Sequence, residues 1–94
     1  MRIEWDESAV QDRERIFEFL YPFNPRAAEQ ADLEIENAVN RLIDNPLLGK
    51  EWIGQGRKLL ISKASLLIVY AVLNKTIIIM AVAHQKEQFP SASL

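Results

Sequence analysis

Basic side chains in the second half of the sequence could support acid–base and phosphate chemistry. They are Arg57, Lys58, Lys63, His84 and Lys86. A histidine can donate or accept a proton near neutral pH, and an arginine can bind two phosphate oxygens at once. The chain has one histidine and no cysteine. The supply of groups for catalysis is therefore thin.

Each of these residues, like each prominent aromatic residue, also has a purely structural interpretation. His84 ends an apolar segment and can serve as a capping or hydrogen-bonding residue. Arg57 can form a salt bridge with a helix carboxylate or contact a strand edge. Tyr70 lies within an apolar run, which favours a core position with its hydroxyl on a backbone partner. Trp5 and Trp52 are expected in the core.

The composition indicates one compact domain over residues 1–94. The chain has 94 residues, of which 49% are hydrophobic, and this is enough apolar side chain for a single core. The absence of cysteine excludes a disulfide framework and a thiolate metal site, and one histidine leaves little for a zinc centre. Neither a metal nor a cofactor is expected.

Charge and hydropathy limit the location and the partners. A formal net charge of -2 and a pI near 5.4 argue against broad affinity for nucleic acid, which depends on Lys and Arg. The apolar stretch Leu66–Val72 is too short to cross a bilayer, and the N-terminus carries charge from Arg2 onward. We expect a cytoplasmic protein outside the membrane, where a reducing environment agrees with the missing cysteines.

The elements that must position these side chains begin with a strand and a helix. Residues Arg2–Trp5 alternate apolar and charged side chains, which predicts a strand. Asp6 or Ser8 can cap the following helix, and Glu7 adds negative charge to its first turn. The apolar face of this helix repeats at three and four residues, at Ala9, Val10, Ile16, Phe17, Leu20 and Tyr21.

A longer second helix forms an antiparallel hairpin with the first. Pro22 and Pro25 end the first helix, and Asn24-Pro25 starts the second because proline in a first turn needs no donor N–H. The sequence Asp44-Asn45-Pro46 stops it. Its apolar and small positions are Ala28, Ala31, Ile35, Ala38, Val39, Leu42 and Ile43. Its acidic residues, Glu29, Asp32, Glu34 and Glu36, are expected on a solvated face.

The second half of the chain predicts a loop and then three strands. Leu47–Gly56 contains three glycines and no clear period, so we expect a loop, with Trp52 and Ile53 packed against the core. The apolar runs Arg57–Ser62, Ser65–Leu73 and Thr76–His84 predict an antiparallel meander. Gln85–Leu94 is a short polar tail. The predicted fold is α+β with the order βααβββ.

The last two strands are apolar at nearly every position. Such strands are expected to be covered on both faces, one by the helices and the other by tryptophan, the loop or a partner. An uncovered apolar strip or strand edge on a domain this small would promote aggregation. A partner segment is the simplest cover, as an added strand or as a helix in a groove.

Several motifs follow one another at spacings typical of one toxin family. They are Ile3-Glu4-Trp5, Asn24-Pro25-Arg26-Ala27-Ala28, Leu42–Gly49, Gly56-Arg57-Lys58-Leu59, Leu67–Val72, Ile79–His84 and His84–Pro90. Together with the order of elements, they resemble the RelE/ParE superfamily of toxins from type II toxin–antitoxin systems. Among its members, the ParE-like toxins are the more similar.

The resemblance implies one of two modes of action. RelE-like toxins cleave messenger RNA at the ribosome, whereas ParE-like toxins inhibit DNA gyrase without chemistry of their own. Both kinds are silenced by a cognate antitoxin, whose extended or helical segment wraps the toxin in a hetero-oligomer. If this chain were a ribonuclease, its catalytic residues would be Arg57, His84 and Lys86.

Three departures from the family pattern favour the gyrase inhibitor. Many relatives carry arginine directly after the third-strand tyrosine and again three residues before the fourth-strand histidine, where this chain has Ala71 and Ala81. Alanine can neither bind phosphate nor stabilise a charged transition state. RelE-like enzymes also use a terminal tyrosine, and Phe89 cannot transfer a proton. Two alternatives stay open: a RelE-like ribonuclease, or a degenerate toxin that retains only antitoxin binding.

A substitution at Arg57 would test both active modes. Arg57→Ala is expected to weaken growth arrest by either mechanism and to leave folding intact.

Overall fold

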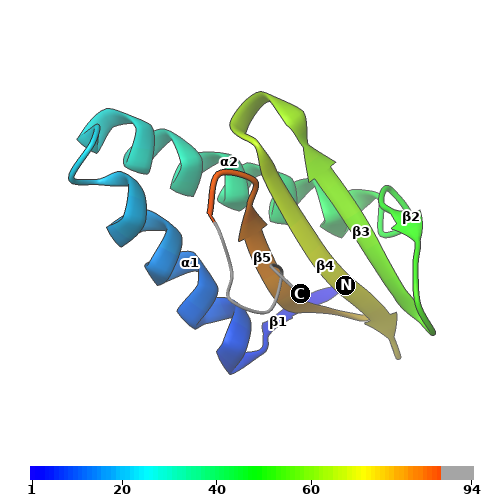
Figure 1. Ribbon diagram of the computed structural model, residues 1–94. Coiled ribbons are helices and arrows are strands. Elements are labelled where there is room, and N and C mark those ends of the chain that lie inside the picture. The colour runs from blue at the N-terminus through cyan, green and yellow to red at the C-terminus, as the bar shows by residue number, and fades with distance from the viewer. Residues whose placement is uncertain (88–94) are drawn as a thin grey trace.

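The computed structural model describes residues 1–87 and shows two helices packed on a five-stranded mixed sheet (Figure 1). The elements are β1 Arg2–Trp5, α1 Glu7–Leu20, α2 Pro25–Asp44, β2 Lys50–Glu51, β3 Gly56–Ile61, the 3-10 turn η1 Ser62–Ala64, β4 Leu66–Leu73 and β5 Thr76–His84. The strand order is β1-β5-β4-β3-β2. β1 is parallel to β5, and the other neighbours are antiparallel. The predicted α+β fold is confirmed, with β2 added to it.

The start of α2 follows from its local sequence. The side chain of Asn24 accepts hydrogen bonds from the backbone N–H groups of Arg26 and Ala27, at 3.1 and 3.3 Å. Pro25 occupies the first turn, where its missing N–H costs nothing. The predicted cap is therefore confirmed. Within residues 1–87, neither helix combines the length and apolar composition needed to cross a membrane.

Small residues and the two ion pairs of Arg13, with Asp32 and Glu36, join the two helices. Ala28, Ala31 and Ala38 are buried, and their small side chains let α2 pack closely. The guanidinium of Arg13 on α1 donates to both carboxylate oxygens of Asp32 on α2, at 2.6 and 3.1 Å. The hydrogen bond to Asp32 raises the pKa of Arg13. The side chain of Arg13 thus stays charged and links the helices.

Helix α1 also covers part of a strand edge. β1 pairs with β5 only as far as Ile79. Beyond that point the hydroxyl of Ser8 donates to the carbonyl of Met80, and the N–H of Val82 donates to the carboxylate of Asp12, each at 3.0 Å. Figure 1 shows α1 alongside β5, while α2 crosses behind the sheet. Side chains of α1 therefore take the place of a neighbouring strand.

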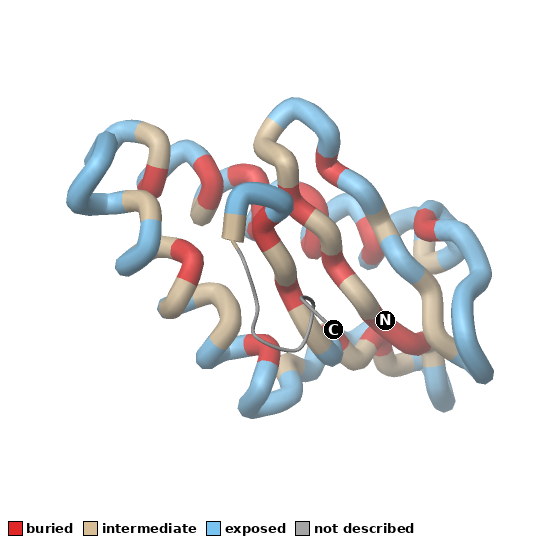
Figure 2. Tube along the Cα trace, viewed as in Figure 1, coloured by how far each residue is buried: buried red, intermediate tan, exposed pale blue. Residues whose placement is uncertain are grey.

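The core lies between the helices and one face of the sheet. Buried and partly buried positions alternate along β4 and β5 (Figure 2). The fully buried strand residues are Leu66, Ile68, Tyr70, Ile77, Ile79 and Val82. Met80 is an extra residue in β5, because Ile79 lies opposite Tyr70 and Ala81 lies opposite Val69. This bulge moves the inward positions of β5 from odd to even residue numbers.

Two expectations about burial are wrong. Trp52 and Ile53 do not pack against the core, since 45% and 77% of their surfaces are exposed. Their segment contains β2, which holds them at the rim of the sheet. Glu34 does not lie on a solvated face: it is buried, accepts a hydrogen bond from Gln30 and lies 3.2 Å from the ammonium of Lys63. A partner on η1 thus permits a carboxylate inside the molecule.

Candidate functional site

His84 ends β5 in a buried position, with only 5% of its surface exposed. Its Nδ1 accepts the backbone N–H of Lys86 at 3.1 Å, and its ring lies 6.4 Å from the ring of Phe19. Burial lowers the pKa of His84, and the charge of Lys86 adds to this, while Glu87 opposes it. These contacts stabilise the neutral imidazole. They correspond to the structural interpretation of His84.

Arg57 is held at the opposite end of the sheet. Its guanidinium donates to the carbonyl of Gly49 at 2.7 Å and lies 3.7 Å from the carboxylate of Glu51 on β2. Of the two structural interpretations drawn from the sequence, this arrangement agrees with the contact to a strand edge, because Glu51 lies on the edge strand β2 and not on a helix. The partners of Arg57 come from the segment between α2 and β3. The Arg57 guanidinium therefore stabilises the segment between α2 and β3.

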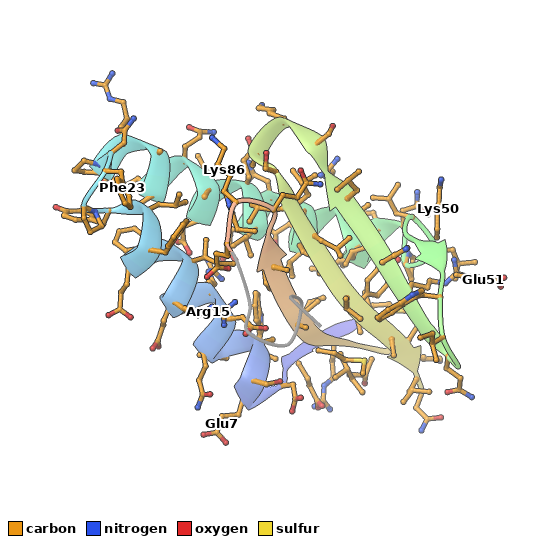
Figure 3. All side chains as sticks on the ribbon, in the orientation of Figure 1. Glu7, Arg15, Phe23, Lys50, Glu51 and Lys86 are labelled. Atoms are coloured by element: carbon orange, nitrogen blue, oxygen red, sulfur yellow. The ribbon has the colours of Figure 1, made fainter. Side chains whose placement is uncertain are left out.

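The structure does not bring the three proposed catalytic residues together. Arg57 lies opposite Tyr70, and His84 lies opposite Leu66. These positions on β4 are four residues apart, which corresponds to roughly 13 Å along a strand. Figure 3 shows Lys86 far from Glu51, the ion-pair partner of Arg57. No common site for Arg57 and the other two is formed.

His84 and Lys86 do share a cleft of about 250 Å³. The cleft is also lined by Glu34 and Lys63, which form an ion pair with each other. His84 is buried and held by a backbone N–H, so the exposed titratable side chains of this cleft are the two lysines, Lys63 and Lys86, of which Lys63 is paired with Glu34. Lys58, another candidate from the sequence, lies on the face of the sheet that points away from the helices, beside Leu60 and Leu67. Phe89 lies outside the described residues.

Ala71 and Ala81 lie on the face of the sheet that points away from the core. Ala71 is opposite Ile78, and Ala81 is opposite Val69, so each alanine faces an apolar neighbour. At both positions the sheet carries a small apolar side chain where a phosphate-binding arginine would add charge. This part of the sheet therefore has the character of a contact surface.

That surface, called here the open sheet face, is the feature that the sequence alone locates least well. Its apolar residues are Leu60, Leu67, Val69, Ala71, Leu73, Ile78 and Met80, with Trp52 and Ile53 at the rim. A cavity of about 590 Å³ lies between the rim and β4 and β5. Leu60, Leu73 and Met80 are exposed. The expected cover was the helices on one face and tryptophan, the loop or a partner on the other. The helices lie on the opposite face, and Trp52 and Ile53 border the open sheet face at its rim.

Two lysines border the open sheet face. Lys50 on β2 lies directly opposite Lys58 on β3. The ammonium of Lys58 lies 5.8 Å from the centre of the Trp52 ring. Lys58 is a candidate from the sequence, whereas Lys50 is not, because Lys50 faces Lys58 only when β2 forms. A strand of two residues leaves no pattern in the sequence from which β2 could be predicted.

The family model described as "ParE toxin of type II toxin-antitoxin system, parDE" matches residues 3–89. The chain belongs to the ParE toxin family. No curated protein matches the sequence significantly. The family match confirms the predicted resemblance and identifies the chain as a type II toxin of the ParE/RelE superfamily.

Solved structures of toxins and toxin–antitoxin complexes share the fold of this chain. A structure of the chromosomal ParDE toxin–antitoxin system from P. aeruginosa has a TM-score of 0.78 at 22% identity, over 89% of this chain and 95% of that chain. The isolated E. coli RelE toxin gives 0.63 at 13%, over 98% and 90%. The intact E. coli RelBE complex gives 0.62 at 12%, over 92% and 98%. At these identities the likeness concerns the fold.

Proposed function

We propose that this ParE toxin arrests growth by binding a protein, with DNA gyrase as the target, and that a cognate antitoxin neutralises it. The observation that carries the proposal is the open sheet face, an apolar surface that includes Ala71 and on which Leu60, Leu73 and Met80 are exposed. Contiguous exposed apolar surface marks a protein–protein interaction site. The toxin would act in the cytoplasm as a single domain.

The placement of the cations argues against the ribonuclease alternative. RNA cleavage requires a base, an acid and a cation around one phosphate. Arg57 is bound to Gly49, and His84 is buried at the other end of the sheet. His84 is buried on the core side of the sheet, and Arg57 lines a cavity at the rim beside Trp52 and Leu73. The only described lysines beside that face are Lys50 and Lys58.

An antitoxin partner is proposed from the same surface. Structures similar in fold include the ParDE system and the RelBE complex, both of which are toxin–antitoxin assemblies by title. Cover by a partner chain would remove the exposed apolar surface of Leu60, Leu73 and Met80 from water. The toxin would then exist as a hetero-oligomer until the antitoxin is lost.

The target can be tested by inducing the chain without an antitoxin. Plasmid supercoiling and messenger RNA integrity are followed in the same culture. Lost supercoiling with DNA damage supports gyrase inhibition. Rapid transcript cleavage would establish the RelE-like alternative instead, and normal growth would indicate a degenerate toxin that keeps only antitoxin binding. Supercoiling of relaxed plasmid by purified gyrase, measured with and without the chain, is the matched test in vitro. Reduced supercoiling in the presence of the chain supports gyrase inhibition.

A further inference from the structure

The cleft of about 250 Å³ at the end of β5 is separate from the open sheet face. Its lining comes from α1, α2, η1 and the residues around the end of β5, on the side of the sheet that the helices cover. The volume is below the roughly 300–1,000 Å³ of pockets for drug-sized ligands, so the cleft suits one small group. Its polar side chains belong to Gln30, Glu34, Lys63, Ser65, His84 and Lys86.

The imidazole of His84 presents a hydrogen-bond donor to this cleft. Its Nδ1 accepts the backbone N–H of Lys86 at 3.1 Å, so in the neutral ring the proton is on Nε2. His84 is 5% exposed, and within residues 1–87 its Nε2 forms no hydrogen bond. In that part of the chain every fully enclosed side-chain nitrogen has a partner. The Nε2–H group therefore reaches the cleft that His84 lines.

The same tautomer makes His84 a binding group and not a base. The lone pair of Nδ1 is engaged by a backbone N–H, and Nε2 already carries the proton. Burial lowers the pKa of His84, which favours this neutral form. A general base needs a free lone pair directed at the proton it removes. Toward the cleft, the ring can only donate, so its ligand must carry an acceptor.

Two further donors lie beside the ring. Lys86 follows the end of β5 (Figure 3), is exposed, and forms no ion pair within residues 1–87. Its charge contributes to lowering the pKa of His84, so its ammonium is close to the imidazole. The backbone N–H of Gln85 donates to the carbonyl of Ser65 at 2.8 Å and holds Ser65 at the same end of the sheet. An ammonium, a hydroxyl and an imidazole N–H thus line one small cleft.

The charges of the cleft favour a ligand with a single negative charge. The buried carboxylate of Glu34 accepts a hydrogen bond from Gln30 at 3.1 Å and lies 3.2 Å from the ammonium of Lys63. Glu34 and Lys63 therefore balance each other. Since His84 is neutral, the ammonium of Lys86 leaves one positive charge in excess. A carboxylate balances that charge and accepts hydrogen bonds with two oxygens, whereas a phosphate dianion would leave negative charge beside Glu34.

We propose that this cleft binds a carboxylate group, which accepts hydrogen bonds from His84 Nε2 and the Ser65 hydroxyl and pairs with the ammonium of Lys86. The carboxylate belongs either to a free small molecule or to an acidic side chain of a bound protein. The inference goes beyond the proposed function and is independent of it, because it requires neither gyrase nor an antitoxin.

The test titrates the purified chain with acetate and with glutamate blocked at both ends, at constant ionic strength and about pH 7.5, where the imidazole is neutral. Acetamide and the blocked glutamine are the matched uncharged compounds. Saturable NMR shifts of the His84 ring and of the Ser65 and Lys86 amides are expected with the two carboxylates only. Binding of acetate alone would assign a free carboxylate, and equal or tighter binding of the blocked glutamate would assign an acidic side chain.

Lys86→Gln removes the charge but keeps the backbone N–H that fixes the His84 tautomer, and is expected to weaken binding about tenfold. Lys75→Gln is the matched control, because Lys75 lies in the turn at the other end of β5. Glu34→Gln releases Lys63 and is expected to tighten binding. No saturable shift, equal binding of the uncharged compounds, unchanged binding by Lys86→Gln, or tighter binding of inorganic phosphate than of acetate would each overturn the proposal.

Discussion

The hydroxyl of Tyr70 lies 2.8 Å from the amide nitrogen of Gly49 and accepts its hydrogen bond. The same hydroxyl donates to the carbonyl of Pro46, also at 2.8 Å. Tyr70 is fully buried in the middle of β4. A core side chain thus satisfies two backbone groups of the segment after α2, as its position in the sequence predicted. This contact determines where β2 begins.

Tyr70→Phe is expected to destabilise the fold by about 1–3 kcal/mol, because it leaves two buried backbone groups without a partner. Urea unfolding measures the change. Tyr21→Phe is the control, since Tyr21 is exposed and stacks on Phe17 through its ring. Equal stability of the two variants would show that the Tyr70 hydroxyl contributes little.

Gly49→Ala is expected to disturb the same contact from the other side. A Cβ at residue 49 would lie 2.8 Å from the carbonyl oxygen of Lys58 and 2.8 Å from a ring carbon of Tyr70. Neither neighbour is the free end of a flexible chain, so we expect a loss of about 1–3 kcal/mol. Thermal unfolding checks it against Gly54→Asn, which meets open space at a positive φ that asparagine tolerates. A neutral Gly49→Ala would contradict the close packing.

Arg57→Ala is now expected to reduce stability, contrary to the expectation from the sequence that folding stays intact. Arg57 donates to the carbonyl of Gly49, and a hydrogen bond from a charged group contributes about 1.5–3 kcal/mol. Urea unfolding of Arg57→Ala and Lys58→Ala compares a half-buried donor with its exposed neighbour. If Arg57→Ala unfolds like the parent, any loss of growth arrest can be assigned to a functional contact.

Local signals in the sequence were enough to predict most of the fold. The cap of α2 depends on Asn24 and Pro25, which act within one turn, and the apolar runs mark β3, β4 and β5 nearly to the residue. The family pattern then supplied the topology. Such signals cannot predict which face of the sheet each side chain of β4 and β5 occupies, because both strands are apolar at consecutive positions. The bulge at Met80 changes that assignment midway along β5.

The candidate site was harder to predict than the fold, for reasons of register. Arg57 and His84 lie near strand ends in the sequence, but pairing with β4 separates them. Lys50 and Glu51 form β2. This short strand places Lys50 opposite Lys58 and leaves Trp52 exposed. A strand of that length has no periodicity to detect. The open sheet face is therefore a tertiary property.

Burial of His84 predicts a dependence of stability on pH. Burial lowers the pKa of His84 in the folded chain below the ordinary value of 6.5, so the unfolded chain binds the proton more readily. Stability contributed by the neutral imidazole is present above pH 6.5 and decreases as pH falls from there toward the lower folded pKa. Below the folded pKa the loss is complete.

The contribution of His84 can be isolated with His84→Asn, whose side-chain oxygen can accept the N–H of Lys86 without titrating in this range. Urea unfolding is measured at about pH 7.5 and about pH 5.5, above and below the ordinary histidine pKa. The parent is expected to lose more stability between these values than the variant does. The two chains differ only at residue 84, so the difference between their pH dependences reports on that position. An identical pH dependence in parent and variant would mean that His84 is protonated without cost inside the fold, and that its burial does not stabilise the neutral form.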